Sequence, residues 1–144
     1  MKPLNSLRDQ QGVMLLEGLI AILIFSMGIL GLMGLQAASI KSVTDSKFRT
    51  DAAFFANRII SQMWVDDKTN LSTLYATGGT KYSAWLTEMQ NSQTRLPGST
   101  GANAPTVTFN TIPGLNFNQV TVTLFWQAPN DPNRHQYTAV AQIN

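Results

Sequence analysis

The chain has 144 residues, of which 44% are hydrophobic, a formal net charge of +2 at pH 7 and no cysteine. This length suits one modest domain, or a small domain with an anchor. The small and dispersed basic excess gives no support to nucleic-acid binding, which needs clustered lysine and arginine. The lack of cysteine excludes disulfides, thiol nucleophiles and cysteine-based zinc sites.

The first twelve residues, MKPLNSLRDQQG, form a short polar segment in which Lys2 and Arg8 outnumber Asp9. Basic residues ahead of an apolar run favour a cytoplasmic location for that end of the chain. Residues 13–35 follow as an apolar run whose only strongly polar side chain is Glu17. A membrane-spanning helix needs about 20 apolar residues, so we expect this run to cross a membrane once.

Two ordinary explanations of this run leave features unexplained. A secretory signal peptide has an apolar core of about 7–15 residues and a small-residue cleavage site. The run here is longer and no A-x-A-like site follows it, although the small residues of QAASIKSV keep that interpretation open. A simple signal anchor fits the length, but it gives no role to Glu17, and a charge at the bilayer centre costs about 2.5–3.5 kcal/mol.

Gly12 followed by Val-Met-Leu-Leu-Glu resembles the class III signal of type IV pilins and pseudopilins. The resemblance implies that a prepilin peptidase cuts between Gly12 and Val13 and methylates the new amino terminus of Val13. Glu17 then becomes the fifth residue of the mature chain. The family more often has phenylalanine where Val13 stands. The run SMGILGLMGLQAASI, residues 26–40, is most similar to the PilV-type minor pilins.

Glu17 needs a partner if apolar helices pack around it in a filament. Removing one partner of a buried ion pair costs about 3–5 kcal/mol. Our hypothesis is that the Glu17 carboxylate pairs with the terminal amine of a neighbouring subunit; the alternative is that it takes up a proton. The glycines of the run would let helices approach closely; they are Gly18, Gly28, Gly31 and Gly34.

The helical pattern continues past residue 35. Apolar residues recur at spacings of three and four, which indicates one helical face; they are Phe48, Ala52, Phe55, Ile59 and Met63. Asp45–Arg49 and Lys47–Asp51 are candidate ion pairs on the same helix. We therefore expect one helix from about Val13 to Trp64, with an amphipathic second half that covers a head domain.

Shorter elements are predicted after this helix. Gly78–Gly79 marks a loop, and a short helix through Tyr82, Trp85, Leu86 and Met89 would be capped by Thr80 or Ser83 and ended by Pro97. Residues 97–105 are expected to form an exposed loop. Alternating residues then predict three strands near 107–109, 120–126 and 137–142, connected in the last case through 128–134.

The predicted fold is α+β and resembles the type IV pilin lollipop, a long N-terminal helix on a small antiparallel sheet of three to four strands. The corresponding parts are a leader at residues 1–12, a transmembrane or filament-core helix at 13–35, and the amphipathic half-helix with its α+β head at 36–144.

Residues that carry chemistry are few in the head. His135 is the only histidine and follows a turn, so a surface or structural role is expected. Asp66 and Asp67 are expected to be solvent-exposed acids. Together with Asp131 they could bind calcium, but the sequence shows no loop of oxygen ligands at regular spacing. We expect no metal, no cofactor and no enzymatic activity.

The resemblance implies a minor pilin of a type IV pilus, which helps to initiate the filament near its tip. Its implied partners are the prepilin peptidase, the major pilin, other minor pilins and a larger tip protein. It would first cross the inner membrane once, with a periplasmic head. The alternatives are a minor pseudopilin of type II secretion and a signal-anchored envelope enzyme or binding protein. A nucleic-acid-binding head would require the cations Lys68, Lys81, Arg95 and Arg134 to share one face.

Overall fold

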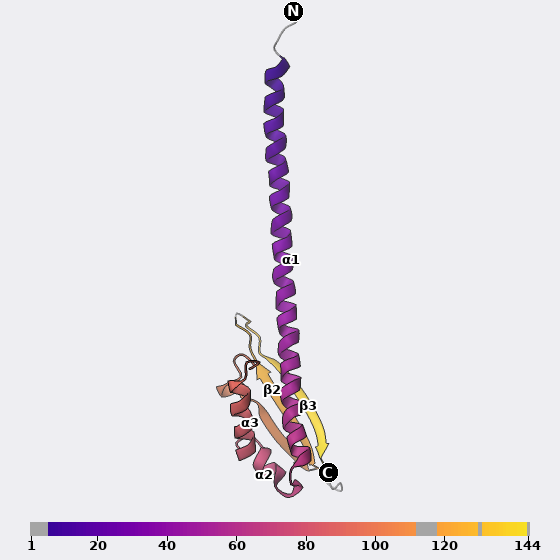
Figure 1. The fold of residues 1–144 in the computed structure, drawn as a ribbon, viewed down its shortest axis with the longest axis vertical. Helices are drawn as coiled ribbons and strands as arrows, with labels where there is room; N and C mark the ends of the chain where they lie inside the picture. Colours follow the sequence, from indigo (N-terminus) through magenta and orange to yellow (C-terminus); the bar gives the residue numbers. More distant parts are fainter. Residues whose placement is uncertain (1–5, 112–117, 130, 144) are drawn as a thin grey trace, which may run out of the picture. The chain divides into compact units, whose positions relative to one another are not determined.

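The computed structural model describes residues 6–111, 118–129 and 131–143. The chain divides into two compact units, Met1–Thr44 and Asp45–Asn144. Helix α1, Ser6–Val65, runs through both of them (Figure 1).

The described part of the first unit is helical throughout. Its apolar side chains are exposed, with Val13 at 64% and Leu35 at 70% of their full accessible area. By length and composition, one helix in the described residues could cross a membrane, and it lies near the N-terminus. The predicted helix is therefore present, but α1 begins at Ser6, ahead of the predicted start at Val13. Leucine, arginine and glutamine between Ser6 and Gly12 are good helix formers, which accounts for the earlier start.

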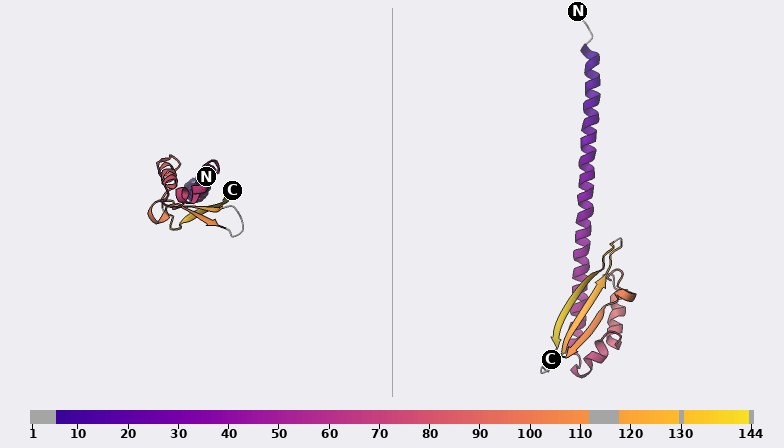
Figure 2. Two further views of the ribbon diagram at one scale, coloured as in Figure 1. Left: turned by 90° about the horizontal axis from the view of Figure 1, so that it is seen from below. Right: turned by 180° about the vertical axis from the view of Figure 1, so that it is seen from behind.

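The second unit contains the end of α1, several short helices and one sheet. In chain order the elements after α1 are η1 (Lys68–Asn70), α2 (Leu71–Tyr75), α3 (Thr80–Asn91), η2 (Gly101–Asn103), β1 (Thr106–Thr111), β2 (Asn118–Trp126) and β3 (His135–Ile143). The three strands are antiparallel in the order β1-β2-β3. The end of α1 and helix α3 lie on the same face of the sheet (Figure 2). The three predicted strands and the antiparallel sheet are confirmed.

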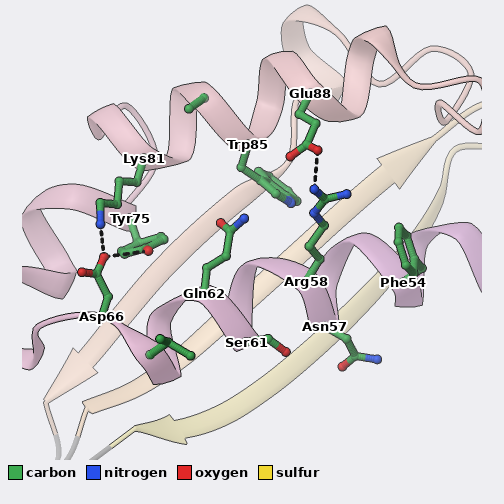
Figure 3. Close-up of a pocket in the computed structure, with 12 residues that line it drawn as sticks. Phe54, Asn57, Arg58, Ser61, Gln62, Asp66, Tyr75, Lys81, Trp85 and Glu88 are labelled. Atoms are coloured by element: carbon green, nitrogen blue, oxygen red, sulfur yellow. Dashed lines mark hydrogen bonds and ion pairs between the residues drawn. The ribbon is translucent and has the colours of Figure 1, made fainter.

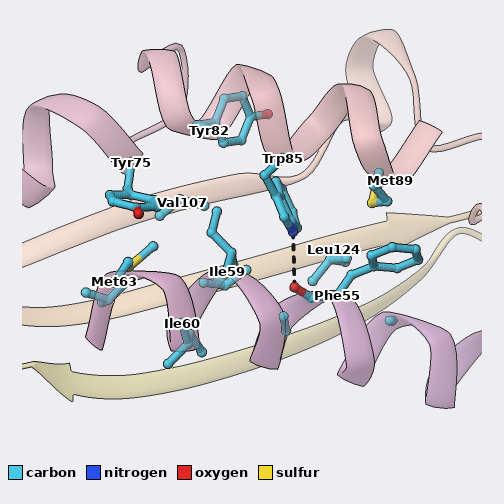
Figure 4. Packing of buried hydrophobic residues seen from close by; sticks show 14 of the residues in the cluster. Phe55, Ile59, Ile60, Met63, Tyr75, Tyr82, Trp85, Met89, Val107 and Leu124 are labelled. Atoms are coloured by element: carbon cyan, nitrogen blue, oxygen red, sulfur yellow. Dashed lines mark hydrogen bonds between the residues drawn. The ribbon is translucent and has the colours of Figure 1, made fainter. Parts of the chain in front are cut away.

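One face of the sheet forms the core with the helices. Val120, Val122, Leu124 and Trp126 are fully buried at alternate positions of β2. The predicted face of α1 is also buried, except that Phe48 is only partly so. Trp85 of α3 joins the two helices, because its indole N–H donates to the carbonyl of Phe55 at 3.2 Å (Figure 4).

The segment between α1 and α3 is more ordered than its sequence suggested. Asp67 starts η1 by accepting a hydrogen bond from the backbone N–H of Thr69 at 2.9 Å. Leu71 and Tyr75 of α2 are buried in the core. The predicted loop at Gly78–Gly79 is confirmed, since α3 begins only at Thr80.

The predicted caps of α3 are wrong. Gly79 occupies the cap position and makes no side-chain hydrogen bond there. A Cβ atom on Gly79 would lie only 2.3 Å from the carbonyl oxygen of Leu74, so a side chain that could cap the helix does not fit. Ser83 instead donates its hydroxyl to the carbonyl of Gly79 at 2.8 Å. Pro97 does not end this helix, which stops at Asn91.

Candidate functional site

The three site residues predicted from the sequence lie together near the start of α1. Gly12, Val13 and Glu17 are all exposed. Val13 and Glu17 are four residues apart, so they share one side of the helix with a rise of about 6 Å between them. A Cβ atom added to Gly12 would have no neighbour within 4 Å among the described residues, so open space surrounds this position.

Glu17 differs from the other polar group of the apolar run in its hydrogen bonding. Ser26 donates its hydroxyl to the carbonyl of Ile22 at 2.7 Å, so the helix itself satisfies it. Within residues 12–111, 118–129 and 131–143, no ion pair involves the Glu17 carboxylate. Any compensation for this charge in an apolar environment must therefore come from outside the described residues.

The glycines of the run make no close packing contacts with the described part of the chain. A Cβ atom at Gly18, Gly28, Gly31 or Gly34 would have no neighbour within 4 Å. In a helix interior each glycine costs about 1 kcal/mol relative to alanine. The described contacts do not offset this cost, whereas close helix–helix packing between chains would make use of the small side chains.

The head carries an open groove of about 990 Å³ between the end of α1 and α3. Two ion pairs connect the helices across it, Arg58 with Glu88 and Asp66 with Lys81 (Figure 3). Tyr75 donates its hydroxyl to Asp66 at 2.8 Å. The charges of the groove are thus directed at each other.

The protonation states of Asp66 and Tyr75 in this groove do not change around neutral pH. The Lys81 ammonium, the Tyr75 hydroxyl and the N–H of Asp67 lower the pKa of Asp66 to about 2. Burial, followed by the neighbouring Asp66, raises the pKa of Tyr75 to about 12. Asp66 therefore stays charged and Tyr75 neutral, which suits a structural ion pair rather than proton transfer at neutral pH. The expectation of a solvent-exposed acid is wrong for Asp66, which is partly buried and paired with Lys81, whereas Asp67 is exposed as expected. Sequence spacing did not indicate the ion pair, because Lys81 comes from another helix.

His135 is built into the structure at the start of β3. Its ring stacks on Trp126 at a centroid distance of 5.7 Å. Its Nε2 lies 3.3 Å from Asp131 and its Nδ1 lies 3.6 Å from Asp45. The two carboxylates face different ring nitrogens, so they do not converge on one metal position. Among the residues searched, no group of three or more histidine, cysteine or acidic side chains could hold a metal ion.

Two further expectations concern charged residues of the second unit. The first is the two candidate ion pairs on α1, and the second is the set of four cations that a nucleic-acid-binding head would need on one face. Lys47 lies 4.0 Å from Asp51, as predicted, but no ion pair joins Asp45 and Arg49 among the described residues. Three of the four head cations have local structural roles. Lys81 binds Asp66, Lys68 binds the carbonyl of Met63 at 2.9 Å, and Arg134 lies over the ring of Phe125.

The site at the start of α1 thus holds a carboxylate within an apolar run and without an ion pair among the described residues, while the charges that line the head groove are paired. Comparison of the chain with protein-family models, with curated proteins and with solved structures finds no match.

Proposed function

We propose that this chain is a minor pilin of a type IV pilus, a structural subunit that helps to start filament assembly near the tip. The observation that carries the proposal is Glu17. It is a carboxylate shortly after Gly12 with no ion pair among the described residues, in a helix whose neighbouring side chains are apolar and exposed.

The chemistry of this segment supports processing at Gly12. Cleavage after Gly12 creates a positive amine on Val13, one helical turn from the Glu17 carboxylate. When such helices pack side by side, both charges leave water, and an unpaired buried charge costs about 3–5 kcal/mol. Pairing between Glu17 of one subunit and the Val13 amine of its neighbour offsets this cost and fixes how far one helix is shifted along the other.

The proposal also includes the membrane location, the processing and the partners of the chain. Before assembly, α1 crosses the inner membrane with its N-terminus in the cytoplasm and the head in the periplasm. The prepilin peptidase removes residues 1–12 and methylates Val13. The chain then packs with the major pilin, other minor pilins and a large tip protein, and its function is this packing rather than catalysis.

Mass spectrometry of the N-terminal peptide, from cells with and without the prepilin peptidase, tests the class. We expect N-methyl-Val13 as the first residue when the peptidase is present and an uncut N-terminus when it is absent. A chain that keeps residues 1–12 in peptidase-positive cells would make it a signal anchor. A chain that starts beyond residue 35 would make it a secreted protein, and either result would refute the proposal.

The role of Glu17 needs a separate measurement. Glu17→Leu is expected to be processed normally but to be depleted from sheared filaments, and Glu17→Asp, which keeps the charge, should retain much of the incorporation. If Glu17→Leu entered filaments as well as the unchanged chain, the pairing argument would be wrong even though the pilin class held.

A further inference from the structure

We propose that His135 is a pH-sensitive contact between the sheet and α1: its protonated ring holds Asp45 and Asp131 together, and its neutral ring loses Asp45. This inference goes beyond the proposed function and does not rest on it. His135 is the only histidine of the chain and the first residue of β3. Histidine is the side chain whose charge ordinarily changes between about pH 5 and 8.

The two ring nitrogens of His135 each face a carboxylate. Nε2 lies 3.3 Å from Oδ2 of Asp131, within hydrogen-bond distance. Nδ1 lies 3.6 Å from Oδ1 of Asp45, an ion-pair distance that is too long for a hydrogen bond. A neutral imidazole has an N–H on one nitrogen only, so its other nitrogen would turn a lone pair towards a carboxylate oxygen. The imidazolium form has an N–H on both nitrogens, and this form alone suits both neighbours.

The two carboxylates differ in how firmly they are held. Asp131 accepts a hydrogen bond from the backbone N–H of Asn133 at 3.0 Å. Its own backbone N–H donates to the carbonyl of Ala128 at 3.1 Å, and its carbonyl accepts from the Gln127 side chain at 2.9 Å. The Asp131 side chain is 9% exposed, whereas that of Asp45 is 43% exposed. Asp45 is therefore the partner whose position can follow the charge of the ring.

The ring of His135 is held in place independently of its charge. It stacks on Trp126 with an angle of 15° between the two ring planes, and Trp126 is fully buried. Asp45 is the first residue of the second compact unit. The contact between His135 and Asp45 thus lies where α1 enters the head.

Other charged side chains lie near this contact. Arg134 precedes His135 and lies over an aromatic ring of β2. On α1, Lys41 and Arg49 are each one helical turn from Asp45. Lysine and arginine ordinarily keep their charge between about pH 5 and 8. Among the charged groups around Asp45, His135 is therefore the one that brings a pH dependence in this range.

The direction of the effect follows from the charge of the ring. At acidic pH the ring is positive and attracts the Asp45 carboxylate, and as the pH rises this positive partner is lost. The stabilisation from the contact is therefore present on the acidic side and lost on the alkaline side. An ion pair with an exposed partner of this kind changes an equilibrium constant by about two- to fivefold.

A double-mutant cycle on the full chain in detergent micelles tests the contact. The variants are His135→Gln, Asp45→Asn and H135Q/D45N, and urea unfolding is followed by circular dichroism at about pH 5.5 and about pH 8. The cycle cancels what each substitution changes by itself, including any interaction of Asp45 with its neighbours on α1. We expect the two residues to be coupled by about two- to fivefold in the unfolding constant at the lower pH, and to be uncoupled at the higher pH.

Glu88→Gln is the matched control. It removes a head carboxylate that is paired with Arg58 on the groove, so its cycle with His135→Gln should show no coupling at either pH. If His135→Gln does not fold, Asp45→Asn alone still tests the proposal, because it should raise the unfolding constant about two- to fivefold more at the lower pH than at the higher.

Two outcomes would overturn the proposal. Equal coupling at both pH values would make the contact a fixed structural one, and no coupling at the lower pH would mean that the ring does not hold Asp45. Neither outcome depends on how the N-terminus is processed, so the proposed function would be unaffected.

Discussion

Gly79→Ala separates two explanations for the glycine before α3. Its backbone angles, φ −67° and ψ 161°, are ordinary for alanine. On chain entropy alone, alanine would stabilise the fold by about 0.4–1 kcal/mol. The structure indicates the opposite, because the new Cβ atom would lie 2.3 Å from the oxygen and 2.6 Å from the carbon of the Leu74 carbonyl. Overpacking costs about 1–3 kcal/mol, and here it involves backbone atoms, so we expect a net loss of about 1–2 kcal/mol.

Thermal unfolding of the full chain, followed by circular dichroism, measures this loss. For a domain of this size, each kcal/mol lowers Tm by about 4–8 °C. Gly78 is the matched control, since it has φ +94° and open space around it. Gly78→Asn is strained by the positive φ but meets no neighbouring atom, and asparagine tolerates such angles better than most residues, so we expect a smaller loss than for Gly79→Ala. A Gly79→Ala chain that is as stable as the unchanged protein would show that the close approach of Leu74 is wrong.

Two further predictions concern the stability of the head. Ile59→Ala should cost about 2–5 kcal/mol, because Ile59 is fully buried, while Val65→Ala should cost little because Val65 is 90% exposed; equal midpoints in urea unfolding would contradict this packing. The pKa of Asp66 is lowered from 3.8 to about 2, so its ion pair stabilises the fold above about pH 4 and this contribution is lost as the pH falls towards 2. The pKa of Tyr75 is raised from 10.0 to about 12, so its contribution is lost as the pH rises from about 10 to 12. Asp66→Asn should flatten the acid side of the stability profile, and an unchanged acid side would refute the assignment.

Local patterns predicted the larger elements of the fold. The stripe from Ala52 to Met63 and the alternation in β2 are regular because each element buries one face against the other. Helix α2 was missed because its burial depends on only two side chains, Leu71 and Tyr75, in a segment that reads as polar. The cap of α3 was assigned to the wrong residues, because the constraint at Gly79 comes from the backbone of Leu74. A contact of that kind leaves no periodic signal in a sequence.

The charged residues of the site and of the head could likewise be predicted only in part. The importance of Glu17 could be predicted from the sequence, because a single carboxylate in an apolar run is unusual. The partners of Asp66 and His135 could not be predicted. Lys81 reaches Asp66 from another helix, and Asp45 and Asp131 reach His135 from α1 and from the connection before β3. Sequence spacing does not predict ion pairs between residues that come together only in the tertiary structure.

Helix α1 itself gives a reason to look for function outside the single chain. Beyond Asp45 the helix is apolar on one face, and its own head buries that face in the core. In residues 13–35 the helix is apolar on all sides, and Val13, Leu19, Leu23 and Leu30 are each at least 60% exposed. A helix that is apolar all round requires an apolar environment all round, and a membrane or a bundle of like helices supplies one. A membrane alone gives Glu17 no partner, whereas a bundle of processed chains supplies a terminal amine for every such carboxylate. This difference is why incorporation of the Glu17 variants into filaments, rather than their membrane insertion, tests the proposed function.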